Sequence, residues 1–217
     1  MKFFVDSVDL EAMKPLLKTG VFAGVTTNPT LLKNDGIFGD AVRGRVEDIL
    51  ALSPRKVFVQ SWGQSADELA SHGWSLSQIG PQVIIKLPCT REGLEAAARL
   101  REDDIKTCIT AIYAEHQALL ASAVGAAYGA PYLGRMNDAG LDGHALIAQM
   151  ASSLRILNSK TRVLAASVRS VEDVVLLARC GVTNVTLSPA VAAHLFDEPL
   201  TLAAVQQFET DARGLAQ

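Results

Sequence analysis

The sequence predicts a (β/α)8 barrel, the fold known as the TIM barrel, with an additional C-terminal helix. Three observations support this prediction: short β-type runs alternate with helix-type stretches, the β-type runs number eight, and no linker or low-complexity tract interrupts them. Strict alternation favours parallel strands joined by right-handed crossovers, and a count of eight favours a closed barrel over an open doubly wound sheet. We therefore expect one barrel domain over residues 1–217.

Each expected strand is short, rich in apolar residues, and followed by a stretch that can form a helix. The expected strands span residues 2–6, 24–28, 56–61, 82–88, 106–113, 128–134, 162–168 and 184–189. The clearest helix spans residues 91–102, because its apolar residues recur at helical spacing and Thr90 is a suitable N-cap. A last helix, at about 201–214, has one apolar face, and we expect it to cover one barrel end or to reach a neighbouring subunit.

The composition is that of an ordinary globular protein, with 49% hydrophobic and 20% charged residues and a net charge of −3. Because no basic stripe is present, we expect no nucleic-acid partner. The three cysteines are far apart and form no CxxC motif, which argues against disulfides and zinc and fits a reducing cytoplasm. Residues 117–134 lack charge, but their glycines and proline favour a helix followed by a strand over a membrane span.

An unusual lysine lies near the end of the most hydrophobic expected strand, residues 82–88. The run Val83, Ile84, Ile85 is typical of a strand buried on both faces, and Lys86 comes next. An amine inside a barrel loses the hydration of its ammonium form, and a neutral amine can condense with a carbonyl to form a Schiff base. The pattern alone supports a structural alternative equally well, in which Lys86 pairs with Asp6 or reaches solvent from the strand end.

Polar residues follow the expected strands at the end where barrel active sites lie. In chain order they are Asp6, Thr26, Thr27, Asn28, Gln60, Lys86, Thr110, Tyr113, Tyr132, Arg135, Ser167, Arg169, Thr186 and Ser188. If the fold prediction holds, these side chains converge on one mouth. Two guanidinium groups and a hydroxyl, from Arg135, Arg169 and Ser167, suit a phosphate group, and surface arginines are the alternative. The four histidines lack HxH and HxxxH spacing, so we expect no metal site.

Segments along nearly the whole chain resemble the small transaldolase and fructose-6-phosphate aldolase family. The resemblance is carried by KFFVDS, GVTTNPTLL, VIIKLPCTREGLEA, IKTCITAIYAEHQALLASAVGAAYGAPYLGRMND, VLAASVRS and PLTLAAVQQFETD. It implies a barrel that performs class I aldol chemistry on sugar phosphates and dihydroxyacetone without a cofactor. It also implies a homo-oligomer, a decamer of two pentamers, in which the C-terminal helix reaches a neighbouring subunit.

The resemblance also implies roles for individual residues. Lys86 matches the Schiff-base lysine of the family, which favours the catalytic over the structural alternative. Asp6 and Asn28 match residues that handle substrate hydroxyls and proton movement. Thr26 matches a pocket position, and Thr110 matches the residue that holds the catalytic water.

The phosphate-binding residues of the family match Arg135, Ser167 and Arg169 by the same resemblance. Close to them the chain departs from the family pattern, because Asn137 stands where an aspartate is usual. This departure bears on the preferred donor and acceptor more than on the class of reaction.

Two positions divide the family. Transaldolases carry a glutamate at the end of the third strand and a phenylalanine in the sixth-strand motif, where this chain has Gln60 and Tyr132. A glutamine cannot carry a proton in turn, so we expect the phenol of Tyr132 to act as the acid/base. The pattern implies an aldolase that cleaves or forms fructose 6-phosphate from dihydroxyacetone and glyceraldehyde 3-phosphate. The alternatives are a transaldolase that transfers a dihydroxyacetone unit between sugar phosphates and a phosphosugar-binding barrel without turnover.

Overall fold

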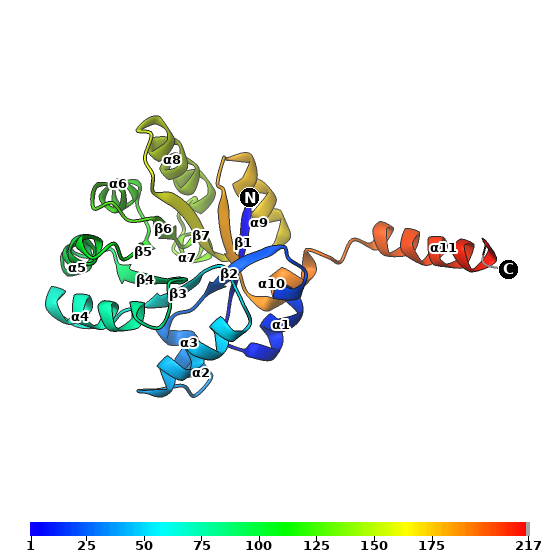
Figure 1. The fold of residues 1–217 in the computed structure, drawn as a ribbon. Helices are drawn as coiled ribbons and strands as arrows, with labels where there is room; N and C mark the ends of the chain where they lie inside the picture. The colour runs from blue at the N-terminus through cyan, green and yellow to red at the C-terminus, as the bar shows by residue number, and fades with distance from the viewer. Residues whose placement is uncertain (216–217) are drawn as a thin grey trace.

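The computed structural model describes residues 1–215, which contain a closed barrel of eight parallel strands (Figure 1). Each strand pairs with its neighbours in sequence, and β8 closes the barrel against β1. The strands are β1 (Lys2–Asp6), β2 (Phe22–Thr26), β3 (Val57–Gln60), β4 (Val83–Pro88), β5 (Thr107–Ile112), β6 (Tyr128–Pro131), β7 (Arg162–Val168) and β8 (Asn184–Leu187). The predicted fold class is therefore confirmed.

Every strand is followed by at least one helix, as the alternation predicts, and the helices surround the barrel. They are α1 (Leu10–Lys18), α2 (Pro29–Asn34), α3 (Ala41–Ala51), α4 (Ala66–Ser77), α5 (Arg91–Glu102), α6 (Glu115–Ala123), α7 (Leu133–Asp138), α8 (Gly143–Ile156), α9 (Val171–Arg179), α10 (Pro189–His194) and α11 (Pro199–Leu215). The helix predicted over residues 91–102 has the predicted bounds, and the Thr90 hydroxyl accepts a hydrogen bond from Gly93 N at 3.1 Å.

Three strands end at least two residues earlier than predicted, and in each case a helix begins at once. β8 ends at Leu187 rather than residue 189, because Ser188 is the N-cap of α10 and Pro189 is its first residue. β2 ends at Thr26 rather than residue 28, because Asn28 is the N-cap of α2 and Pro29 is its first residue. Proline has no N–H to donate to a strand ladder but is well suited to the first turn of a helix. β6 ends at Pro131 rather than residue 134, and Tyr132 is the N-cap of α7.

The barrel interior holds an apolar cluster that is separate from the core between strands and helices. Phe4, Phe58, Ile84, Cys108, Tyr128, Ala130 and Leu164 form it. The Phe58 ring meets the rings of Phe4 and Tyr128 edge to face, at centroid distances of 5.3 and 5.1 Å. Because side chains alternate along a strand, the residues two positions beyond Phe4, Phe58 and Ile84 also face the interior, at the carboxyl end of the barrel. The cluster therefore forms the floor beneath a polar mouth.

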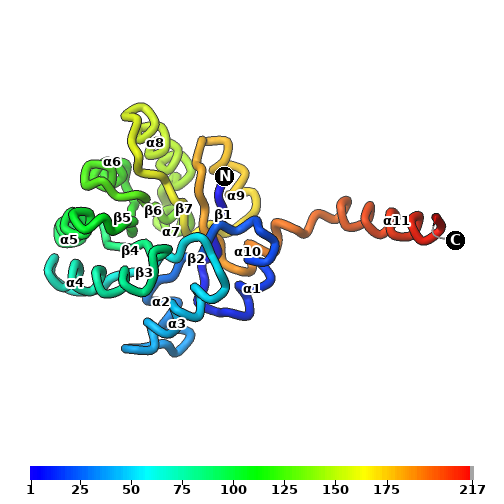
Figure 2. The backbone as a smooth tube through the Cα atoms, viewed as in Figure 1, coloured from blue at the N-terminus to red at the C-terminus, as the bar shows by residue number. Residues whose placement is uncertain are grey.

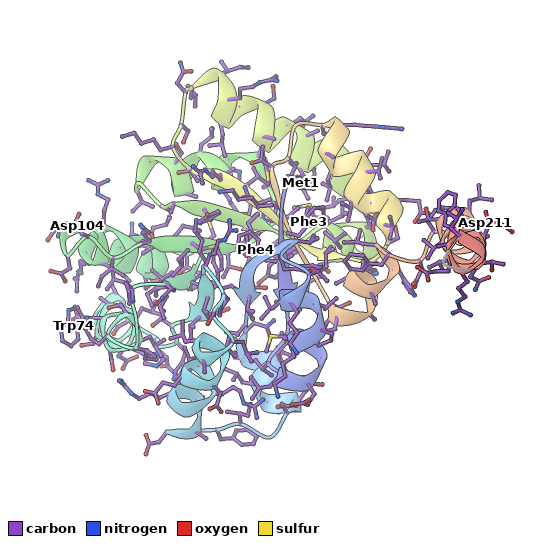
Figure 3. The ribbon with its side chains drawn as sticks, turned by 45° about the vertical axis from the view of Figure 1, so that its right-hand side comes forward. Met1, Phe3, Phe4, Trp74, Asp104 and Asp211 are labelled. Carbon is purple, nitrogen blue, oxygen red and sulfur yellow. The ribbon has the colours of Figure 1, made fainter. Side chains whose placement is uncertain are left out.

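The last helix, α11, extends away from the barrel (Figures 1 and 2). None of its described residues is buried, and Leu202, Val205 and Phe208 on its apolar side are 51%, 50% and 67% exposed. In Figure 3, Asp211 on this helix stands clear of the barrel, whereas Phe4 lies at its centre. The helix predicted at about 201–214 is confirmed. The expectation that it covers one barrel end is wrong, and its contact with a neighbour stays a prediction.

The uncharged stretch at residues 117–134 forms the end of α6, then β6 and the start of α7, which confirms the interpretation as a helix followed by a strand. Across residues 1–215, no helix is long and apolar enough to cross a membrane.

Candidate active site

A cavity of about 440 Å³ opens at the carboxyl ends of the barrel strands. Nine of the ten predicted site residues line it: Asp6, Thr26, Asn28, Gln60, Lys86, Thr110, Tyr132, Arg135 and Ser167. Most of the strand-end polar residues therefore converge on one mouth, and the roles expected for them stay predictions. The tenth residue, Arg169, borders a smaller cavity of about 270 Å³ that shares Asp6, Ser167 and Thr186 with the first.

Lys86 is the most deeply placed charged group of this cavity. It is 5% exposed, and its Nζ donates a hydrogen bond to the carbonyl oxygen of Thr27 at 2.8 Å. Within residues 1–215 it has no carboxylate at ion-pair distance, so the predicted structural alternative of a pair with Asp6 is wrong. The amine therefore lines the cavity, where the carbonyl carbon of a ligand could reach it.

Asp6 lies at the end of β1 and terminates a chain of hydroxyl groups. The Thr26 hydroxyl donates to Asp6 Oδ1 at 2.5 Å, and it also lies 2.6 Å from the hydroxyl of Thr186. A hydroxyl carries one proton, so the Thr186 hydroxyl must donate to Thr26 when Thr26 donates to Asp6. This chain orients one carboxylate oxygen and leaves the other free to meet a substrate hydroxyl.

Tyr132 is held on three sides. Its hydroxyl lies 2.8 Å from the Thr110 hydroxyl. Its ring meets the edge of Tyr113 at a centroid distance of 5.7 Å, and the Arg135 guanidinium lies 4.9 Å from the ring centroid on one face. These contacts fix the phenol in the same cavity as the Lys86 amine, and a phenol can donate a proton while its phenolate can accept one.

Asn28 and Gln60 place amide groups on the side of the cavity formed by β2 and β3. Asn28 Oδ1 accepts a hydrogen bond from Leu31 N at 3.0 Å, so the amide NH2 of Asn28 remains for a ligand. Gln60 pairs with Lys86 across the β3–β4 ladder and lines the same cavity. Both amides can bind hydroxyl groups, and neither can act as an acid or base.

Two strands are distorted where they reach the cavity. Ala111 and Ser167 have φ values of 59° and 56°, in the left-handed region that residues other than glycine rarely adopt. The pairing register shifts beside each of them, between β5 and β6 and between β7 and β8. Such bulges redirect side chains near active sites, and here one of them brings Ser167 into the cavity. The residue types give no signal of this conformation.

Arg135 and Arg169 differ in their surroundings. Arg135 lines the large cavity, and no carboxylate lies at ion-pair distance from it in the described part of the chain. Arg169 is paired with Asp138, a residue that the sequence analysis did not single out. Ser167 borders both cavities and so connects the two arginines.

Two further neighbours, Thr27 and Thr186, were noted only as strand-end polar residues in the sequence. The structure shows that the backbone carbonyl of Thr27 holds the Lys86 amine and that the Thr186 hydroxyl supports Thr26. No sequence pattern identifies a backbone carbonyl as a partner. Among residues 1–215, no group of three or more His, Cys, Asp or Glu residues is placed to hold a metal ion.

Cys108 faces the barrel interior opposite Lys86 on the β4–β5 ladder. Complete burial raises the pKa of its thiol to about 12, and the charge of Lys86 opposes this shift only in part. Cys108 therefore stays a neutral thiol near neutral pH and is a poor nucleophile.

We expect iodoacetamide to modify Cys180, which is exposed, and to leave Cys108 unmodified in the folded protein. Peptide mass spectrometry after a time course checks this, and the denatured protein, in which all three cysteines react, is the control. Native labelling of Cys108 as fast as that of Cys180 would contradict the burial described above.

Comparison with known proteins agrees with the geometry. A family model described as "Transaldolase/Fructose-6-phosphate aldolase" matches residues 3–216. A "Probable transaldolase" of Caulobacter vibrioides (strain NA1000 / CB15N) is 37% identical over 217 residues, covering 100% of this chain and 99% of that protein. A "Probable transaldolase" of Geobacillus sp. (strain WCH70) is 36% identical over 212 residues, with coverages of 97% and 98%.

A solved structure confirms the architecture alone. A chain from Burkholderia cenocepacia J2315, named a "putative phosphonomutase", superposes with a TM-score of 0.63 at 16% identity and covers 95% of this chain and 93% of its own. At that identity only the barrel fold is shared. The match of the family model over nearly the whole sequence, together with relatives above one third identity, is much more specific. This chain therefore belongs to the transaldolase/fructose-6-phosphate aldolase family, whose members are enzymes of the transaldolase or aldolase type.

Proposed function

We propose that this enzyme is a class I aldolase that cleaves and forms fructose 6-phosphate. The observation that carries the proposal is the pairing of a phenol with a hydroxyl, Tyr132 with Thr110 at 2.8 Å, in the cavity that holds the buried Lys86 amine. A proton acceptor and a carbonyl-binding nucleophile are the two groups that cofactor-free aldol cleavage requires. Gln60 replaces the carboxylate that would otherwise supply the acid/base.

The reaction begins when the neutral Lys86 amine attacks C2 of the ketose phosphate. The carbinolamine loses water to form an iminium ion, and this ion withdraws electrons from C3. Asp6, with one oxygen held by Thr26, is placed to bind a substrate hydroxyl and to return a proton to the leaving hydroxyl. The amide NH2 of Asn28 binds a further hydroxyl near the β2 side of the cavity.

Carbon–carbon cleavage follows. The C4 hydroxyl transfers its proton to Tyr132, which acts in this step as the phenolate, directly or through a water held by Thr110 and Gln60. The C3–C4 electron pair moves into the iminium system, which forms an enamine and releases glyceraldehyde 3-phosphate. Tyr132 then returns a proton to C3, and hydrolysis of the resulting iminium ion releases dihydroxyacetone and regenerates Lys86. The proton taken from the C4 hydroxyl therefore ends on C3 of dihydroxyacetone.

The phosphate group binds at the opposite wall, to Arg135, Ser167 and Arg169. A guanidinium without a carboxylate partner favours a dianion, and Arg135 meets that condition among residues 1–215. Arg135 also lies over the Tyr132 ring. The proposed phosphate ligand Arg135 and the proposed acid/base Tyr132 are therefore in direct contact. A phosphate bound to Arg135 would align C4 of the substrate with the phenol.

Transaldolase activity is the second candidate, favoured by the names of the Caulobacter and Geobacillus relatives. The first half of the reaction is then the same, but the enamine attacks a second aldehyde such as erythrose 4-phosphate instead of taking a proton from the enzyme. The two candidates differ only in the fate of the enamine, so an assay without an acceptor sugar separates them.

We expect steady release of glyceraldehyde 3-phosphate from fructose 6-phosphate alone, over many turnovers. A coupled dehydrogenase assay that follows NADH measures this release, and the same assay with added erythrose 4-phosphate is the comparison. Release of no more than one equivalent per subunit, restored to steady turnover by erythrose 4-phosphate, would contradict the aldolase proposal and establish a transaldolase.

We also propose that the protein is a homo-oligomer, with the decamer of two pentamers as the expected form. The exposed apolar side of α11 supports this proposal, because a helix that projects from a barrel with no packing partner in its own chain exposes apolar area to water. Light scattering coupled to size-exclusion chromatography gives the subunit number.

A further inference from the structure

Arg169 and Asp138 form a two-point ion pair between the β7–α9 loop and the end of α7. Arg169 Nη1 donates to Asp138 Oδ1 at 2.7 Å, and Nη2 donates to Oδ2 at 2.5 Å. The hydrogen bonds from Arg169 lower the pKa of Asp138, so its carboxylate is ionised at neutral pH. The carboxylate occupies the end of the guanidinium that carries both Nη atoms, and Nε lies on the side turned to Gly134 and Ser167.

Arg169 Nε lies close to Gly134 and Ser167, next to the phosphate-binding region proposed above. A Cβ atom added to Gly134 would come within 2.6 Å of Arg169 Nε, 2.6 Å of the Ser167 carbonyl oxygen and 2.9 Å of Ser167 Oγ. These distances are too short for a real Cβ atom, so glycine at this position lets the Arg169 guanidinium pack against the α7 backbone beside Ser167. Ser167 and Arg135 line the large cavity, so this packing places Arg169 beside the wall that carries the other two proposed phosphate ligands.

The backbone of the same loop is fixed separately from the Arg169 side chain. Asp173 Oδ2 accepts hydrogen bonds from Arg169 N at 3.1 Å and Ser170 N at 3.2 Å. The other oxygen, Asp173 Oδ1, lies 3.1 Å from His144 Nε2 of α8. The loop therefore keeps its place without Asp138. Asp138 instead fixes the orientation of the Arg169 side chain, which is 57% exposed and would otherwise sample several rotamers.

We propose that Asp138 is a positioning residue that holds the guanidinium of Arg169 beside Ser167, at the proposed site of the substrate phosphate, and so raises selectivity for phosphorylated aldehydes. The inference rests on the proposed function, because it concerns the same phosphate subsite. An arginine fixed at one end by a carboxylate binds a phosphate oxygen with less loss of side-chain freedom. Asp138 touches no reacting atom, so its effect falls on substrate binding.

The decisive experiment compares two acceptors that differ only in the phosphate, glyceraldehyde 3-phosphate and glyceraldehyde, at saturating dihydroxyacetone. In Asp138→Ala we expect the KM for glyceraldehyde 3-phosphate to rise roughly two- to fivefold, the range expected for a well-formed exposed ion pair. We expect the KM for glyceraldehyde and both kcat values to stay unchanged. Asp138→Glu, which restores a carboxylate, should recover part of the loss.

A matched control removes the carboxylate of another exposed ion pair. Asp67 on α4 pairs with Arg99 on α5, outside both cavities, so Asp67→Ala should leave both KM values unchanged. The variant Arg169→Ala and the double variant with Asp138→Ala should behave alike, because Asp138 is proposed to act only through Arg169. Calorimetric titration with inorganic phosphate, which needs no turnover, should show the same weakening in Asp138→Ala.

The possible outcomes are distinguishable. An unchanged KM for glyceraldehyde 3-phosphate in Asp138→Ala would overturn the inference, and so would a lower KM, which would mean that Asp138 competes with the phosphate for Arg169. In either case a wild-type preference for glyceraldehyde 3-phosphate over glyceraldehyde would leave the proposed phosphate subsite standing. A wild-type enzyme that does not distinguish the two acceptors and does not bind inorganic phosphate would overturn both proposals.

Discussion

Replacing Lys86 with methionine will abolish turnover and leave the barrel folded. The amine is the only proposed nucleophile, and Schiff-base formation has no substitute once it is lost. Methionine is unbranched and similar in length, so it fills the same channel between the β3 and β5 side chains. Thr27 loses one hydrogen-bond donor, while the unfavourable burial of an ammonium disappears. The two effects oppose each other, so the net change in stability is small.

Three measurements check this prediction. Steady-state assays should show no activity above background for Lys86→Met, and thermal unfolding should show a Tm within about 5 °C of wild type, since about 1 kcal/mol shifts Tm by about 2–4 °C at this chain length. Borohydride reduction in the presence of dihydroxyacetone should add one reduced adduct per wild-type subunit and none to Lys86→Met.

Lys56 offers a matched control. It is a half-buried lysine at the other end of the barrel, where its Nζ contacts the hydroxyl of Tyr128. Lys56→Met should keep both turnover and adduct formation. Appreciable activity in Lys86→Met would end the Schiff-base mechanism. A wild-type protein that forms no adduct at all would favour the phosphosugar-binding alternative over an enzyme.

Replacing Tyr132 with phenylalanine will lower kcat by roughly 10²–10⁴-fold, the usual contribution of a general acid or base. The ring contacts with Tyr113 and Arg135 involve no hydroxyl and remain. The Thr110 hydroxyl loses its partner but still faces the open cavity, where water can replace it. The expected effect is therefore on the chemical step, with little change in KM or stability.

Tyr113→Phe is the matched control, because it removes the phenol hydroxyl of the tyrosine whose ring contacts Tyr132. Tyr113 contacts Tyr132 through its ring, and its hydroxyl has no hydrogen-bond partner among residues 1–215. The activity of Tyr113→Phe should stay within about twofold of wild type, since the substitution removes no interaction of the site. If kcat of Tyr132→Phe equals that of wild type, the acid/base role belongs to another group, and Asp6 is the remaining titratable side chain of the cavity beside Lys86.

Local sequence patterns predict the elements that depend on local interactions. The strands at residues 2–6 and 162–168 and the helix at 91–102 have the predicted bounds, because alternation, apolar periodicity and an N-cap are all local. The ends of β2, β6 and β8 were predicted at least two residues too late. At each of these ends an N-cap residue, Asn28, Tyr132 or Ser188, is followed by a helix that takes over the backbone.

The sequence by itself determined the barrel, the end of it that carries the site, and ten of the polar residues that line the cavity, because strand periodicity and chain order imply all three. Only the tertiary structure decided which partners those residues have. Thr27 lies 59 residues from Lys86 in sequence, and Tyr132 lies 22 residues from Thr110. The left-handed backbone of Ser167 and the capture of Arg169 by Asp138 likewise depend on neighbouring strands and loops. Hydrogen bonds and ion pairs act over a few ångströms in space, and distance along the chain does not specify them.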